Sequence, residues 1–248
     1  MPLYRDEAVV LRAFPLGEAD RIVVLLTKQH GKVRAVAKGV RRLKSRFGGR
    51  LEPLMRVDVL LAQGKSLDVV SQAVSISAYA GPICADYTSY EYASVMLEVA
   101  DALVSNEYTD EYMREYQDTS GQYRLLTAAL SSLSNRKHAP NAIGISYLLR
   151  AMSLAGWSPR LKTCVVCGKE ENLCYFSPSA GGVMCAGDHT PESIICSDET
   201  RLQLFALLQG DWSSIDGVPI DSSTLSCAKL WAEYYLERPI RSMGLISD

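Results

Sequence analysis

The sequence predicts an α+β protein in which a small closed β-barrel precedes a helical domain that a cysteine-rich segment interrupts. Residues 1–80 contain five strand-like stretches joined by short turns, and the hydrophobic pattern after Pro82 changes to helical spacing. Four of the seven cysteines then lie between Cys164 and Cys185. We therefore expect a barrel domain at 1–81 and a helical domain at 82–248, with the cysteine segment at 160–195.

The five strand-like stretches are rich in β-branched residues and are bounded by turn residues. Gly31 can supply the positive φ of a tight turn between the second and third of them, and a longer connection rich in Gly and Arg follows the third. The "GKS" at Gly64 to Ser66 is expected to be a hairpin turn, because a phosphate-binding loop needs a glycine where Val59 stands. The stretches are 7–14, 20–28, 32–39, 55–62 and 67–77.

Three later stretches place apolar residues on one helical face, as core-facing helices do. Gly81 and Pro82 end the strand pattern before the first, Pro140 begins the second, and Gly156 ends it. The apolar stripes are Tyr92, Met96, Val99 and Leu103; Ile145, Leu148, Leu149 and Met152; and Leu225, Ala228, Ala232 and Tyr235.

Composition favours a globular protein of the cytoplasm. The chain has 248 residues, of which 48% are hydrophobic, and its apolar runs are too short to span a membrane. Arg5, Asp6 and Glu7 stand where a secretion signal would need its apolar core. An odd number of cysteines without an export signal indicates thiols and metal rather than disulfides.

A basic block, residues 28–50, contrasts with the rest of the chain. It holds nine of the 26 Lys and Arg residues and none of the 28 Asp and Glu residues, although the net charge of the chain is only −2. Solubility alone does not need so many uncompensated charges, so the block indicates a polyanionic partner. A small barrel of the OB type is a common platform for single-stranded nucleic acid. Because aromatic residues are few in residues 1–80, binding should depend mainly on phosphate contacts.

The cysteine segment begins with Cys164-Val-Val-Cys167-Gly168, a pattern typical of a zinc knuckle. Two residues between the cysteines let both thiolates face one ion, and the glycine allows a tight turn beneath it. A predicted hairpin then returns Cys185 toward the knuckle as a third ligand. His189 is our choice for the fourth, since imidazole suits a thiolate-rich zinc site better than the carboxylate of Asp188. The reserve ligands are Cys174 and Cys196.

A structural metal is the preferred interpretation of this segment. A redox dithiol would need its first cysteine at a helix N-terminus, whereas Cys167 leads into a polar turn. A catalytic zinc needs an open position and a general base, and the His-x-Glu of the zinc deaminases is missing. No other catalytic signature was found, so we expect a structural Zn²⁺ in a protein that is not an enzyme.

The run "VAKGVRRLKSRFGGRLEPL", from Val36 to Leu54, together with "CVVCG…FSPSAGGVMC", resembles the RecO family of bacterial recombination and repair proteins. The likeness extends over almost the whole chain. It implies an N-terminal OB fold that binds single- and double-stranded DNA, anneals complementary strands and, with RecR, helps load RecA onto coated single strands. It also implies that the C-terminal tail of the single-stranded-DNA-binding protein docks on the helical domain, in a nucleoid-associated, cytoplasmic protein without membrane contact.

The resemblance also implies which residues do this work. Cys164, Cys167 and Cys185 match zinc cysteines of the family, but many relatives have a second Cys-x-x-Cys where this chain has Asp188, so the choice between His189 and Asp188 stays open. The implied DNA contacts are Lys32, Arg34, Lys38, Arg41, Arg42, Lys44 and Arg46.

Two other functions compete with this one. A zinc-dependent enzyme that modifies nucleotides or bases would alter its substrate chemically. A basic zinc-ribbon adaptor would use the basic block to meet an acidic protein and would not bind DNA.

Overall fold

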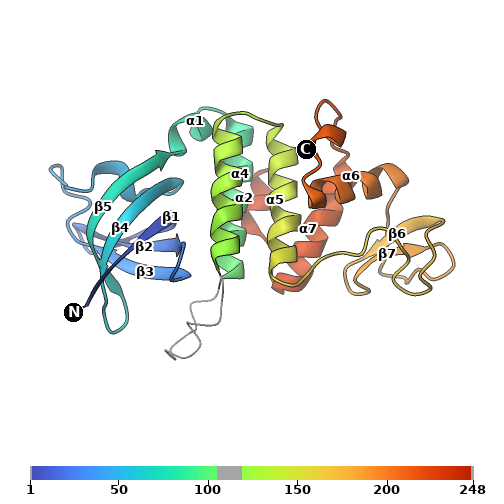
Figure 1. Cartoon of the computed structure of the whole chain (residues 1–248), viewed down its shortest axis with the longest axis horizontal. Coiled ribbons are helices and arrows are strands. Elements are labelled where there is room, and N and C mark those ends of the chain that lie inside the picture. The colour runs from blue at the N-terminus through green and yellow to red at the C-terminus, as the bar shows by residue number, and fades with distance from the viewer. Residues whose placement is uncertain (1, 105–118, 247–248) are drawn as a thin grey trace. The chain divides into compact units, whose positions relative to one another are not determined.

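The computed structural model describes residues 2–104 and 119–246, and all structural statements below concern these residues. Contacts within the chain divide it into two compact units, Met1–Asn135 and Arg136–Asp248 (Figure 1). The boundary expected after residue 81 falls inside the first unit, where helices pack against the barrel. An independently folding domain at 1–81 therefore stays a prediction.

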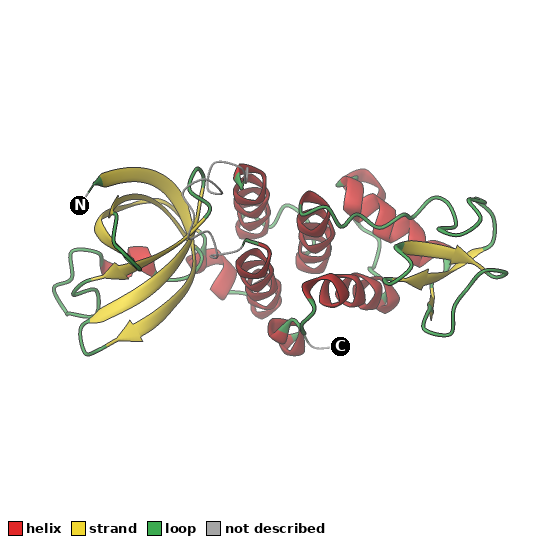
Figure 2. Ribbon diagram, turned by 90° about the horizontal axis from the view of Figure 1, so that it is seen from below, coloured by secondary structure: helices red, strands yellow, loops and turns green. Residues whose placement is uncertain are grey.

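The first unit contains the predicted five-stranded closed barrel, with the strand order β1-β2-β3-β5-β4 (Figures 1 and 2). All pairings are antiparallel except that of β3 with β5, which is parallel, and β1 closes the barrel by pairing with β4. The 3₁₀ helix η1 (Gly48–Leu51) lies in the long connection after β3. The strands are β1 (Leu3–Leu16), β2 (Asp20–Thr27), β3 (Lys32–Ala37), β4 (Met55–Ala62) and β5 (Asp68–Ala78), which confirms the five predicted stretches.

The barrel forms because side chains alternate between its interior and solvent. Along β3, Val33, Ala35 and Ala37 are buried while Arg34 is exposed, and β4 alternates in the same way. The turn at Gly64 needs its glycine, because a Cβ there would lie 1.9 Å from the carbonyl oxygen of Leu67. Gly31 has the positive φ, +66°, that the sequence predicted for its turn.

Helices complete the first unit. Asp86 caps α2 by accepting a hydrogen bond from the Ser89 N–H at 2.9 Å. Tyr123, on α4, contacts the barrel by donating to Glu7 at 3.1 Å and accepting from Arg56 at 3.0 Å. The helices are α1 (Ala80–Cys84), α2 (Tyr87–Leu103) and α4 (Ser120–Ser134), and α2 and α4 lie side by side (Figure 1).

The second unit packs three helices against one another and adds a small three-stranded sheet in the order β7-β6-β8. The indole of Trp231 is buried on α7 and donates to the carbonyl oxygen of Trp157 at 3.1 Å. The elements are α5 (Pro140–Leu154), β6 (Leu173–Ser177), β7 (Gly182–Cys185), β8 (Ile194–Ile195), α6 (Asp198–Gln209), η2 (Trp212–Ser214), α7 (Ser222–Leu236) and η3 (Arg241–Leu245).

Most predicted elements are confirmed, and three of the described α-helices were missed. The three predicted helical stripes correspond to α2, α5 and α7, and the predicted cysteine hairpin is β6–β7. The helices α4 and α6 were not expected, and neither was the short α1, where Gly81 and Pro82 had indicated a break. Among the described helices none has both the length and the apolar character that crossing a membrane requires.

Candidate metal centre and basic surface

The cysteine segment starts with a knuckle that the backbone itself shapes. The Gly168 N–H donates to the Cys164 carbonyl at 3.0 Å, and the Cys164 N–H donates to the Lys169 carbonyl at 2.7 Å. Gly168 has a φ of +76°, which a residue with a Cβ rarely adopts. This closed turn places the thiols of Cys164 and Cys167 on one side, as the spacing predicted.

The β6–β7 hairpin returns the third cysteine to the knuckle. Gly182 lies so close to Arg160 that a Cβ would be 2.1 Å from the Arg160 carbonyl oxygen, so only glycine permits this pairing. The Val165 N–H donates to the Val183 carbonyl at 3.0 Å, which ties the knuckle to β7. Cys185 ends β7, and the Asp188 N–H donates to its carbonyl at 3.2 Å, so the chain turns back toward the thiols.

Four ligand atoms meet at this point, those of Cys164, Cys167, Cys185 and Asp188, and all lie within 4.8 Å of one another. The sulfurs of Cys167 and Cys185 are 3.7 Å apart. Tetrahedral zinc with Zn–S bonds of about 2.3 Å would separate two sulfurs by about 3.8 Å, so the spacing fits such an ion. The Asp188 carboxylate is 3.1 Å from the Cys185 sulfur and 3.5 Å from that of Cys164.

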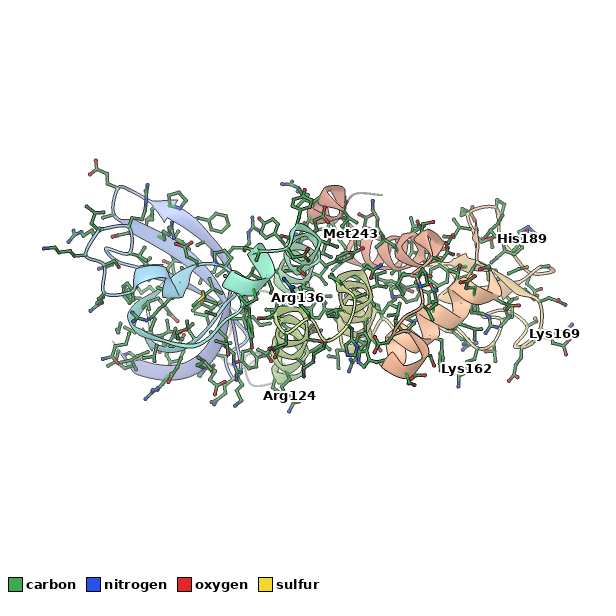
Figure 3. The ribbon with its side chains drawn as sticks, turned by 90° about the horizontal axis from the view of Figure 1, so that it is seen from above. Arg124, Arg136, Lys162, Lys169, His189 and Met243 are labelled. Carbon is green, nitrogen blue, oxygen red and sulfur yellow. The ribbon has the colours of Figure 1, made fainter. Side chains whose placement is uncertain are left out.

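His189, the predicted fourth ligand, does not belong to this group. Its Nδ1 lies 2.9 Å from the Ala186 carbonyl oxygen, and its ring stacks on Tyr175 with centroids 4.1 Å apart. Figure 3 shows His189 on the loops of the cysteine segment, as it shows Lys169. The structure thus gathers the three predicted cysteines and puts Asp188 in the fourth position.

Hydrogen bonds shift the pKa values of this group in both directions, and the one to Asp188 raises the pKa of the Cys167 thiol to about 12. Burial raises the pKa of the Cys164 thiol, but hydrogen bonds from backbone N–H groups outweigh it and lower the pKa to about 7. Hydrogen bonds from the Cys167 and Cys185 thiols hold the pKa of Asp188 below its ordinary value. With one carboxylate and three thiols, the group can complete a tetrahedron from protein atoms alone, and this leaves no open position for catalysis.

The reserve cysteines lie elsewhere. Cys174 is partly buried on β6, and its carbonyl accepts a hydrogen bond from the Cys196 N–H at 2.9 Å. Cys196 is fully buried, and its thiol interacts with that of Cys227 on α7. Neither contributes to the four-atom group.

The basic block continues from β3 into a surface loop, residues 38–50, which we call the basic loop. Six of the seven predicted DNA contacts are exposed, five in this loop and Arg34 on β3, and within the described part of the chain none forms an ion pair with a carboxylate. No carboxylate among the described residues therefore neutralises their charges. The six are Arg34, Lys38, Arg41, Arg42, Lys44 and Arg46.

Lys32 differs from these six. Its side chain is only 8% exposed, and its Nζ donates to the backbone carbonyl and to the carboxylate of Asp101, the latter at 3.1 Å. Asp101 lies in the last turn of α2 and also pairs with Arg12 at 3.1 Å. The predicted DNA contact of Lys32 stays a prediction, but in this structure its ammonium group attaches α2 to the barrel instead of facing solvent.

Buried apolar residues hold the basic loop in place. Val40 is 8% exposed, and Phe47 and Leu51 are each 1% exposed within the barrel core. At its start, the Gly39 N–H donates to Asp20 at 2.7 Å and the Arg41 N–H donates to the Ala19 carbonyl at 2.9 Å. The loop is thus exposed in its charges and fixed in its backbone.

No pattern in the sequence had indicated a role for these buried residues or for Leu43. Leu43 is completely exposed, with a relative exposure of 107%, between the cations of the basic loop. The i, i+7 and i, i+4 spacing of Val40, Phe47 and Leu51 was a usable signal, but in a Gly-rich connection it does not indicate a helix.

Two models of known protein families match this chain. The model of the family described as "Recombination protein O N terminal" matches residues 1–79, and that of "Recombination protein O C terminal" matches residues 84–245. The chain is 57% identical over 253 residues to the DNA repair protein RecO of Bifidobacterium adolescentis, covering 99% of this chain and 100% of the relative. It is 55% identical over 248 residues to that of Bifidobacterium longum strain DJO10A, covering 100% of both, and 43% identical over 251 residues to that of Nocardioides sp., covering 98% and 99%.

Proposed function

Because this chain belongs to the RecO family, we propose that it acts in DNA repair and recombination by binding DNA through the basic loop. The substrates are single- and double-stranded DNA, and the reaction promoted is the annealing of complementary strands. The protein is proposed to be a mediator and not an enzyme. The relatives described above are named DNA repair protein RecO, and the similarity extends over essentially their full length.

The observation that supports DNA binding most strongly is the state of the six exposed cations. Within the described residues none has a carboxylate partner, although the chain carries two more acidic than basic residues. Guanidinium and ammonium groups that have no described carboxylate partner, on β3 and on a loop with a fixed backbone, suit phosphates, which repeat along any sequence. We assign this contact to Arg34, Lys38, Arg41, Arg42, Lys44 and Arg46, and we leave Lys32 out because Asp101 already binds it.

Annealing follows from charge screening. Two complementary strands repel each other, and a cationic surface that neutralises phosphates on both lowers the barrier to their meeting. Phosphate contacts carry no sequence information, so the strands can shift along the surface until their bases pair. The protein needs no covalent chemistry for this.

We propose that Cys164, Cys167, Cys185 and Asp188 bind one Zn²⁺, whose role is structural. The segment contains long irregular turns beside its short strands, and four protein ligands would stabilise those turns. Further partners are proposed from the family: RecR, the C-terminal tail of the single-stranded-DNA-binding protein, and RecA as the indirect beneficiary. The expected location is the nucleoid in the cytoplasm.

A salt series on the full-length protein tests the proposal. Binding to a labelled single strand and annealing of complementary oligonucleotides are measured for the wild type and for a variant with Arg41, Arg42, Lys44 and Arg46 changed to Ala. Each lost phosphate contact should flatten the log–log salt dependence by about 0.7, so the variant should lose up to roughly 3 units of slope and anneal more slowly. A matched control changes four exposed cations outside the basic loop, Lys65, Arg124, Lys137 and Lys162, and should keep the wild-type slope.

The competing functions predict different outcomes in the same experiments. A nucleotide- or base-modifying enzyme would return chemically altered DNA, which mass spectrometry of the recovered oligonucleotide detects. An adaptor for an acidic protein would leave the labelled strand unbound even at low salt. Either result would contradict the proposed function.

A further inference from the structure

Leu43 is the most exposed of the large hydrophobic side chains described in the first unit, and it stands within the basic loop. Its relative exposure of 107% exceeds the 60% of Leu3 and the 57% of Val74. A leucine with no protein contact is a common surface feature when it stands alone. Here the surrounding backbone defines its position, and the residues on either side of it in the sequence, Arg42 and Lys44, are both charged.

Two successive turns fix that position. The Arg42 N–H donates to the Gly39 carbonyl at 3.2 Å, and the Ser45 N–H donates to the Arg42 carbonyl at 2.9 Å. Leu43 is therefore the first central residue of the second turn, where side chains point outward. Buried Val40 precedes this turn and buried Phe47 follows it, so the loop cannot rotate Leu43 inward without releasing one of them.

The basic loop has no other apolar side chain to offer a ligand. Phe47, its only aromatic residue, is 1% exposed and belongs to the barrel core, where the Arg46 guanidinium lies 4.8 Å from its ring centroid. Proteins that bind single strands usually stack bases on exposed aromatic rings. In this loop the only apolar surface available for that purpose is Leu43.

The cations around Leu43 restrict what can cover it. Arg41, Arg42, Lys44 and Arg46 have no carboxylate partner among the described residues, so the partner must be anionic and must also present apolar surface within a few ångströms of its charges. A single strand of DNA has this pattern, because each phosphate is followed by a base whose face is free. A duplex does not, because its base faces are stacked.

We propose that Leu43 packs against the face of an unstacked base in single-stranded DNA, while the flanking cations hold the phosphates on either side. This inference rests on the proposed function and adds a contact that salt does not screen. A leucine on the face of a base leaves its hydrogen-bonding edge free, so a complementary strand can still pair with it. The contact is also independent of sequence, because every base has such a face.

The experiment compares a normal and an abasic oligonucleotide. Fluorescein-labelled oligothymidylate and an abasic strand of equal length carry the same phosphates, and their binding to the full-length protein is followed by anisotropy over a salt series. Leu43→Ala should weaken binding to oligothymidylate by roughly five- to tenfold, as expected for the loss of a buried isobutyl contact. The salt slope should stay parallel to that of the wild type, because no charge is changed.

On the abasic strand the wild type and Leu43→Ala should bind equally, since the base that Leu43 contacts is missing. Leu43→Phe should bind oligothymidylate at least as tightly as the wild type. Leu3→Ala is the matched control, because it removes an exposed leucine of the same barrel outside the basic loop. Thermal unfolding should be unchanged in all three variants.

Other outcomes would overturn the inference. Equal weakening on both strands would show that Leu43 shapes the loop and does not contact a base. Unchanged binding to both, or weaker binding only to a polyglutamate peptide, would place the leucine in a contact with protein. Failure of the wild type to bind either strand at low salt would overturn the proposed function, and with it this inference.

Discussion

The basic loop and the cysteine segment are both largely irregular stretches of backbone, but they are held in different ways. In the basic loop, Val40 and Phe47 are buried in the barrel core, Leu51 is buried just after it, and the cations have no carboxylate partner among the described residues. In the cysteine segment, the chemically active groups themselves converge, with four ligand atoms within 4.8 Å of one another. One stretch is fixed so that its polar groups can meet a partner, whereas in the other the polar groups converge beside buried residues such as Phe176 and Val183.

This difference has a physical reason. A surface that binds a polyanion must keep its charges unpaired, so it needs apolar side chains to order the backbone. A short hairpin that cannot bury a core of its own can use the same residues as ligands and as structure. Substitutions should therefore separate folding from binding in the basic loop and should fail to separate them in the cysteine segment.

The largest expected effect is that of Cys164→Ser. Cys164 is fully buried within the proposed zinc site, and a structural zinc supplies about 10–16 kcal/mol in small zinc-finger peptides, so the second unit should lose at least roughly 5 kcal/mol of its stability. Metal analysis and chemical unfolding measure the change. Affinity for single-stranded DNA at low salt should stay within about twofold, because the basic loop belongs to the first unit.

Cys84→Ser is the control for that experiment. Cys84 is an exposed free thiol at the end of α1, so its replacement should alter neither metal content nor stability. Full zinc content in Cys164→Ser would refute the proposed ligand set.

Phe47→Ala tests the basic loop in the same way, because it should change the stability of the barrel without removing a charge. Removal of a fully buried ring costs about 3–5 kcal/mol, here from the barrel, and frees the backbone of the basic loop. The loop keeps every cation, so the salt slope of DNA binding should change little while affinity falls, because the loop must be ordered on binding. Phe14→Ala, at a ring that is 38% exposed, should have a small effect on stability. A steep loss of slope in Phe47→Ala would mean that the fixed backbone sets which phosphates are reached.

A smaller effect distinguishes Asp188 from His189. Asp188→Ala removes a proposed ligand and should weaken zinc binding by more than the roughly ten- to hundredfold that loss of an outer-shell partner costs. His189→Ala removes only a ring stacked on Tyr175, so zinc affinity should be close to that of the wild type. Competition with a chromophoric chelator measures both. The reverse order would restore the ligand set expected from the sequence.

The sequence allowed prediction of the barrel and most of the cysteine cluster, because both depend on local patterns. Alternation gave the strands, and Cys-x-x-Cys-Gly gave the knuckle. The choice between Asp188 and His189 depended on the turn after Cys185, which donor chemistry alone does not reveal. A signal was missed for α4, whose Tyr123, Leu126, Leu130 and Leu133 share one helical face, and for α6, which Ser197 caps.

The fate of Lys32 was beyond sequence reasoning, because its partner Asp101 stands 69 positions away. On β3 it occupies the same face as Arg34, and periodicity treats the two alike. Only the packing of α2 against the barrel distinguishes Lys32 from Arg34. The helix covers Lys32 and leaves Arg34 exposed.

This pair gives the smallest and most selective test. Lys32→Ala should cost about 1–2 kcal/mol of stability, since Asp101 loses one cation but keeps Arg12, and the end of α2 loses a donor to its free carbonyl. The salt slope of Lys32→Ala should equal that of the wild type.

Arg34→Ala removes an exposed guanidinium without a described ion pair, so stability should hold while the slope flattens by about 0.7. Thermal unfolding and the salt series are measured on both proteins. If Lys32→Ala flattened the slope and Arg34→Ala did not, the DNA would lie along the α2 side of β3, and the basic loop would no longer be the principal contact.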